Sequence, residues 1–114
     1  GTVIDGACRD VDESRERGYP VYAVTGVPTT ARGRIEEVSC NEPVVIQNVI
    51  VAPGDLVLAD GSGVVFVPAD RAEEIIAKAE HIAAREAEMA KAVLAGKSIV
   101  EVMGTNYETM LERK

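Results

Sequence analysis

Cysteine, histidine and aromatic residues are scarce in this sequence. The two cysteines, Cys8 and Cys40, are too few and too irregularly placed for a disulfide framework or a zinc site, and His81 has no second histidine with which to share a metal ion. Aromatic residues make up 4% of the chain and tryptophan is absent, so we expect a core built mainly of Val, Ile, Ala and Leu. The sequence therefore predicts neither a disulfide-stabilised fold nor a thiolate or histidine metal site.

Positive charge is also in short supply. Lys and Arg total 12 against 19 Asp and Glu, which gives a formal net charge of −7. No basic patch exists to neutralise phosphates, so we expect no nucleic-acid partner. An anionic small substrate would need a local positive site, and Arg9 together with a metal ion could supply one.

Long apolar runs are missing as well. No run approaches ~18 residues and no signal-peptide pattern opens the chain, so we expect no membrane partner and a cytoplasmic location. The 114 residues are 46% hydrophobic, which is enough for one compact core. We therefore expect residues 1–114 to form a single domain.

The first residues of the chain carry the strongest chemical signal. Thr2 to Ile4 are all β-branched, as in a buried strand, and the Asp5-Gly6 pair that follows favours a turn that ends the strand. Residues 10–17 are highly charged and predict a short helix with acidic residues in its first turn. Arg9 and Asp10 would then lie between the carboxyl end of a strand and the next helix, where open α/β folds bind ligands.

Arg9 and Asp10 suit one task especially well. A guanidinium holds a carboxylate through two parallel hydrogen bonds, and a carboxylate oxygen is a natural ligand for a hard cation such as Mg²⁺, which needs only one or two protein carboxylates. The plainer alternative is a surface ion pair at the start of a helix, worth ~0–1 kcal/mol. An Arg-Asp dipeptide is a weak motif and does not decide between the two.

The middle of the chain predicts strands and tight turns. Residues 19–24 form the next expected strand, and the β-α-β order predicts a right-handed parallel crossover. After Arg34 the pattern changes to antiparallel, with tight turns expected at Gln47-Asn48, Pro53-Gly54-Asp55 and 60–63. The strands expected there are residues 35–40, 44–46, 49–51, 56–59 and 64–67.

The last third of the chain predicts helix. Residues 69–95 show apolar positions at helical spacing, with Asp70 as the expected N-cap and Glu73 three residues later. A helix of about 25 residues spans ~37 Å, longer than a domain of this size covers by itself, so part of it is expected to pack on another subunit or on further chain. Residues 97–114 predict a second helical extension, with an apolar stripe that includes Tyr107, Met110 and Leu111.

Several segments in order resemble one family. These are VIDGACRDVDE at residues 3–13, GYPVYA at 18–23 and APGDLVLADGSGVVFVP at 52–68, followed by the long alanine- and glutamate-rich helix. Together they resemble the RraA-like family, which includes the 4-hydroxy-4-methyl-2-oxoglutarate aldolases. The resemblance implies an α/β fold, layered β/β/α and swivelling-domain-like. It also implies that the chain is the C-terminal part of such a domain, incomplete without an N-terminal half of about a hundred residues.

The resemblance also implies a function. The expected activity is a divalent-metal aldolase, using Mg²⁺ or Mn²⁺, that cleaves a 4-hydroxy-2-oxo acid to pyruvate, with oxaloacetate decarboxylation as a side activity. By the match to the family's DGxxRD motif, Arg9 would be the catalytic and substrate-binding residue, holding the 2-oxo acid carboxylate and the developing enolate charge. Asp10 would bind the metal. No lysine falls within the motif, which speaks against a Schiff base.

Two further expectations come from the same family. RraA-like proteins assemble as trimers or hexamers, so a homo-oligomer is expected. The family also contains inhibitors of ribonuclease E that act by binding protein, and this is the alternative function. A binding role needs no metal and tolerates loss of Asp10, so metal dependence separates the two alternatives.

Overall fold

The computed structural model describes residues 1–104. The chain divides into two compact units, Gly1–Ala72 and Glu73–Lys114, which we call the strand unit and the helix unit and describe separately. The predicted apolar stripe at Tyr107, Met110 and Leu111 lies outside the described residues. The division of the chain into domains stays a prediction.

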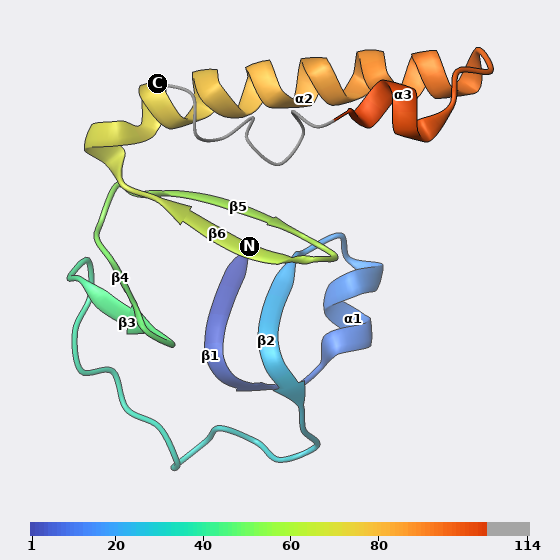
Figure 1. The fold of residues 1–114 in the computed structure, drawn as a ribbon. Helices are drawn as coiled ribbons and strands as arrows, with labels where there is room; N and C mark the ends of the chain where they lie inside the picture. Colours follow the sequence, from blue (N-terminus) through green and yellow to red (C-terminus); the bar gives the residue numbers. More distant parts are fainter. Residues whose placement is uncertain (105–114) are drawn as a thin grey trace. The chain divides into compact units, whose positions relative to one another are not determined.

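The strand unit opens with a β-α-β element (Figure 1). Strand β1 spans Thr2–Cys8, helix α1 spans Val11–Glu16 and strand β2 spans Val21–Gly26. The two strands pair in parallel, so the predicted parallel arrangement is confirmed. Gly18 ends the helical segment with φ 65°, a left-handed conformation that glycine adopts without steric cost.

The predicted end of the first strand is wrong. Strand β1 continues through Asp5 and Gly6 to Cys8. Ile4 pairs with Ala23 and Ala7 with Thr25, so β1 holds one residue more than β2 over this stretch. The Asp-Gly pair therefore forms a β-bulge, because a bulge accommodates an extra residue while the strand continues beyond it.

Two antiparallel hairpins follow. Strand β3 (Val44–Ile46) pairs with β4 (Val49–Val51), and β5 (Leu56–Asp60) pairs with β6 (Gly63–Val67). The expected turns between them are confirmed. The two hairpins are separate two-stranded sheets in the part of the chain that the structure describes.

The predicted strand at residues 35–40 is also wrong. This stretch has no regular structure and is exposed throughout, with Ile35 at 77% and Val38 at 90% exposure. The β-branched residues Ile35 and Val38 are not enough to form a strand, because a strand requires a neighbouring strand to satisfy its backbone groups. Residues 27–43 instead form a long connection between β2 and β3.

Asp55 ties the second hairpin to the segment that follows it. Its N–H donates to the carbonyl of Ala52 at 3.1 Å, and Gly54 has φ 95°, as a turn of the Pro-Gly type requires. Its carboxylate accepts from the N–H of Ala52 at 2.8 Å and from that of Ala69 at 3.0 Å. Asp70 is therefore not the predicted N-cap. It lies inside a short 3-10 turn at Ala69–Arg71.

The described part of the helix unit contains α2 and α3. Helix α2 spans Ala72–Leu94 and α3 spans Ile99–Met103, with Gly96 at φ 96° in the break between them. The Ser98 hydroxyl accepts from the N–H of Glu101 at 3.1 Å and caps α3. Within the described residues, neither helix is both long and apolar enough to cross a membrane.

Burial in the described chain is slight. Val67 is the one buried hydrophobic residue there, at 3% exposure. Large apolar side chains on the strands stay open to solvent, among them Val24 at 64% and Ile50 at 73%. The mixture of helices and strands gives the predicted α/β class, but the three two-stranded sheets do not enclose a core between them.

Candidate functional site

Arg9 and Asp10 lie between the end of β1 at Cys8 and the start of α1 at Val11. Asp10 is the residue that precedes the helix, and its backbone is left-handed, with φ 62° and ψ 37°. Its carbonyl accepts from the Ser14 N–H at 3.0 Å and from the Ser14 hydroxyl at 2.9 Å. The left-handed conformation is uncommon for a residue with a side chain, and its cost persists only where the surrounding structure imposes it.

The two side chains form an open ion pair. The Arg9 Nε donates to Asp10 Oδ2 at 3.2 Å, and the side chains are 49% and 56% exposed. An exposed pair of this kind contributes ~0–1 kcal/mol to stability, so it does little to hold the fold. The two terminal nitrogens of Arg9 have no hydrogen-bond partner within residues 1–104, so they are available to bind an anion.

Asp10 fits a cation that takes few protein ligands. Its Oδ1 oxygen has no partner among the described residues. The neighbouring acids are already engaged, Asp12 with Arg15 at 3.0 Å and Glu13 with Arg17 at 2.6 Å. No group of three or more His, Cys, Asp or Glu that could hold a metal occurs in the described part of the chain. A single accessible carboxylate suits Mg²⁺ or Mn²⁺ that keeps most of its waters, and it does not suit zinc.

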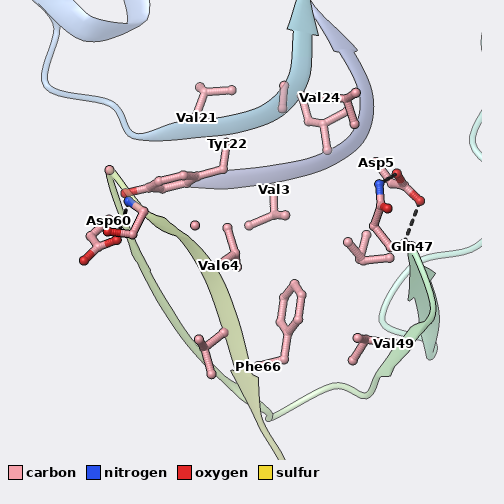
Figure 2. Close-up of a pocket in the computed structure, with 17 residues that line it drawn as sticks. Val3, Asp5, Val21, Tyr22, Val24, Gln47, Val49, Asp60, Val64 and Phe66 are labelled. Atoms are coloured by element: carbon pink, nitrogen blue, oxygen red, sulfur yellow. Dashed lines mark hydrogen bonds between the residues drawn. The ribbon is translucent and has the colours of Figure 1, made fainter.

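A hollow of about 830 Å³ lies elsewhere in the strand unit. Its walls come from all three sheets and are mostly apolar (Figure 2). Neither Arg9 nor Asp10 lines it. The residues predicted to carry chemistry therefore stand outside this hollow.

Asp5 makes a contact that the sequence did not reveal. Its two carboxylate oxygens accept from the Gln47 backbone N–H at 2.7 Å and from the Gln47 side-chain Nε2 at 2.8 Å (Figure 2). Gln47 has φ 56°, so the clamp holds a left-handed residue in the β3–β4 turn. The bond joins that turn to the bulge in β1, four residues before Arg9. The two partners are 42 positions apart, and no local pattern predicts such a pair.

A protein-family model matches residues 1–66 of the chain; it is described as RraA-like, Aldolase/RraA. An uncharacterised protein of Methanocaldococcus jannaschii is 33% identical over 104 residues, which cover 90% of this chain and 49% of that protein. A Halalkalibacterium halodurans protein provisionally named 4-hydroxy-4-methyl-2-oxoglutarate aldolase is 31% identical over 80 residues, which cover 70% of this chain and 38% of that protein.

A solved structure also matches the chain. The crystal structure of an uncharacterised protein from Pseudomonas syringae pv. tomato matches with a TM-score of 0.84 and 30% sequence identity, over 89% of this chain and 50% of that one. The chain thus spans half or less of the length of these relatives. The part of a relative that this chain does not match is called here the unmatched half.

Substitution of Asp10 tests whether its backbone is strained. Asp10→Ala should weaken the first turn of α1 relative to Asp10→Gly, because alanine has a Cβ in the left-handed conformation and glycine does not. Both variants lose the same carboxylate. If the free energy of opening this turn is about 1 kcal/mol lower in the alanine variant than in the glycine variant, amide exchange at Ser14 is roughly five times faster in the alanine variant. Equal exchange in the two variants, measured by NMR, would contradict the strain.

Proposed function

The chain belongs to the RraA-like family, and from this premise we propose that, together with a counterpart of the unmatched half, it forms a divalent-metal-dependent aldolase. The proposed reaction is cleavage of a 4-hydroxy-2-oxo acid, of the 4-hydroxy-4-methyl-2-oxoglutarate type, to pyruvate. The observation that carries the proposal is the juxtaposition of Arg9 and Asp10, where β1 meets α1, each with polar atoms that have no partner within residues 1–104. The provisional aldolase name of one relative supports it. The chain and its counterpart are called below the assembled protein.

Arg9 would bind the substrate. Its Nε is turned toward Asp10, which leaves the two terminal nitrogens for a planar carboxylate. The Asp10 ion pair restrains the guanidinium, so less freedom is lost when the substrate binds. As negative charge develops on the 2-oxo acid during cleavage, the fixed positive charge of Arg9 would stabilise it.

Asp10 would hold the cation through Oδ1 while Oδ2 keeps its bond to Arg9. When bound, a divalent cation supplies Lewis-acid polarisation of the substrate carbonyl. The left-handed backbone fixes the direction in which the Asp10 side chain leaves the chain, and this keeps the carboxylate beside Arg9. The two residues would thereby place the cation and the substrate carboxylate next to each other.

The composition of the strand unit narrows the mechanism. Residues 1–72 contain no lysine, so this unit has no lysine side chain to form a Schiff base with a 2-oxo acid. A site that stabilises the same negative charge would also decarboxylate oxaloacetate, so this is the proposed side activity.

The assembled protein is further proposed to be a homo-oligomer, a trimer or a hexamer. Helix α2 has 23 residues and spans ~35 Å at 1.5 Å per residue, and none of its residues is buried within the described chain. Multi-angle light scattering at micromolar concentration should give a mass of three or six copies. A mass of one copy would contradict the oligomer.

Two substitutions separate the roles of Arg9 and Asp10. In the assembled protein, Asp10→Ala should abolish metal-dependent pyruvate release, because it removes the anionic ligand of a cation that takes few. Arg9→Lys should leave metal affinity nearly intact but lower turnover roughly a hundredfold, or ~3 kcal/mol, because lysine keeps the charge and loses the fork.

The measurement is pyruvate release from 4-hydroxy-4-methyl-2-oxoglutarate and from oxaloacetate during Mg²⁺ titration. Asp12→Ala is the matched control, because Asp12 is the next carboxylate in the chain and pairs with Arg15 instead. Wild-type turnover in Asp10→Ala would remove the metal assignment. Absence of any pyruvate release by the wild type would favour the alternative, a regulator that binds protein.

A further inference from the structure

We propose that Asp5 and Gln47 are positioning residues that set the direction in which Arg9 leaves β1. Asp5 lies in the bulge of β1, and both of its carboxylate oxygens are bonded to Gln47 in the β3–β4 turn (Figure 2). This pair of bonds, the Asp5–Gln47 clamp, ties the strand that leads to Arg9 to a separate hairpin. Its effect on catalysis rests on the proposed function, whereas its effect on the backbone does not.

The bulge decides which face of the sheet the residues after it take. Asp5 and Gly6 together stand opposite Val24 alone, because the pairing resumes one residue later in β1 than in β2. Side chains alternate between the two faces of a strand, so a shift of one residue turns every later side chain to the opposite face. Arg9 directly follows the last residue of β1. Loss of the bulge would therefore turn the guanidinium away from its present direction.

The clamp holds the extra residue at one place. Its bonds measure 2.7 Å to the Gln47 backbone N–H and 2.8 Å to the Gln47 Nε2, distances typical of hydrogen bonds to a charged group. Asp5 and Gln47 are both exposed, so each bond competes with water. Two bonds to one carboxylate nevertheless fix its orientation, and with it the position of the bulge beside Gly6.

The β3–β4 turn is a firm anchor for the clamp. Gln47 has φ 56°, and the strands on either side of the turn pair at three positions. The turn geometry of a hairpin fixes the register of its strands, so the backbone N–H of Gln47 has a set direction. A displacement of Asp5 would have to break this bond or distort the turn.

A second bond holds the segment between Asp5 and Arg9 at its other end. The Val27 N–H donates to the Cys8 carbonyl at 2.9 Å, which continues the pairing of β1 with β2 beyond the bulge. The backbone that leads to Arg9 is therefore fixed at Asp5 on one side of Gly6 and at Cys8 on the other. The Val27 amide thus reports on whether the bulge is in place.

Asp5 has a different task from Asp10. Both Asp5 oxygens accept bonds from Gln47, whereas Oδ1 of Asp10 has no partner among the described residues. Asp10 is also held by its own helix, because its carbonyl accepts from the Ser14 N–H and hydroxyl. Loss of the clamp should therefore disturb Arg9 and leave the proposed cation ligand nearly unchanged.

Amide exchange in the assembled protein tests the effect on the backbone, whatever the activity. Asp5→Ala removes both bonds, so exchange at Val27 should become at least roughly fivefold faster. The Thr2 N–H is the internal control. It donates to the Pro20 carbonyl at 2.9 Å, before the bulge, and its exchange should not change. Gln47→Ala removes one bond of the clamp and should give a smaller increase at Val27, and it serves if Asp5→Ala does not fold.

Pyruvate release and Mn²⁺ binding test the effect on catalysis. Asp5→Ala should lower turnover at least roughly tenfold, because a small misplacement of a substrate-binding group is costly, while Mn²⁺ affinity stays within about twofold. Asp5→Asn should restore most of the turnover. Its amide oxygen can still accept from the Gln47 N–H, and its NH₂ group can donate to the Gln47 amide oxygen after that amide rotates.

Asp55→Ala is the matched control. The Asp55 carboxylate also accepts two bonds, from the N–H groups of Ala52 and Ala69, but it joins segments other than β1. Its loss should leave turnover within about twofold of the wild type at temperatures where the variant is folded, because Arg9 keeps its position.

Unchanged exchange at Val27 in both Asp5→Ala and Gln47→Ala would overturn the positioning role. Equal loss of turnover in Asp5→Ala and Asp55→Ala, or no recovery in Asp5→Asn, would overturn its effect on catalysis. Absence of pyruvate release by the wild type would instead contradict the proposed function. Exchange at Val27 would then decide by itself whether the clamp positions Arg9.

Discussion

The uncovered apolar face of the strand unit is the constraint on which the rest of the account depends. A sheet of two strands cannot bury both of its faces, and three such sheets here leave Val67 as the one buried hydrophobic residue of the described chain. Two carboxylates join separate segments of the unit. The Asp5 carboxylate clamps the β3–β4 turn to β1, and the Asp55 carboxylate fixes the start of the segment after β6.

The same constraint explains why the candidate site is open. Arg9 and Asp10 are positioned by local backbone features, the bulge in β1 before them and the left-handed conformation of Asp10 itself. Such features need little surrounding core. They place two charged groups side by side but provide no walls around them, and specificity for a substrate requires groups that surround it. The proposed aldolase therefore needs a second polypeptide segment to complete its site.

Local signals in the sequence predicted local structure well. Gly18, the Gln47-Asn48 pair and Pro53-Gly54 each impose or favour a backbone conformation by themselves, and each lies in the expected turn. The predicted strand end at Asp5-Gly6 was wrong because an Asp-Gly pair is compatible with both a turn and a β-bulge. Pairing of β1 with β2 determines which of the two forms. The Asp5–Gln47 and Asp55–Ala69 bonds depend on partners far apart in the chain, so no pattern of neighbours could predict them. Residues 35–40 include the β-branched Ile35 and Val38, but no described strand pairs with them.

The proposed function depends most directly on the binding of a divalent cation by Asp10 beside Arg9. Electron paramagnetic resonance of Mn²⁺ added to the assembled protein tests it directly, because free and bound Mn²⁺ give different signals. The account predicts one bound Mn²⁺ per chain in the wild type and in Asp12→Asn, and at least a tenfold loss of affinity in Asp10→Asn. Unchanged Mn²⁺ binding in Asp10→Asn would contradict it.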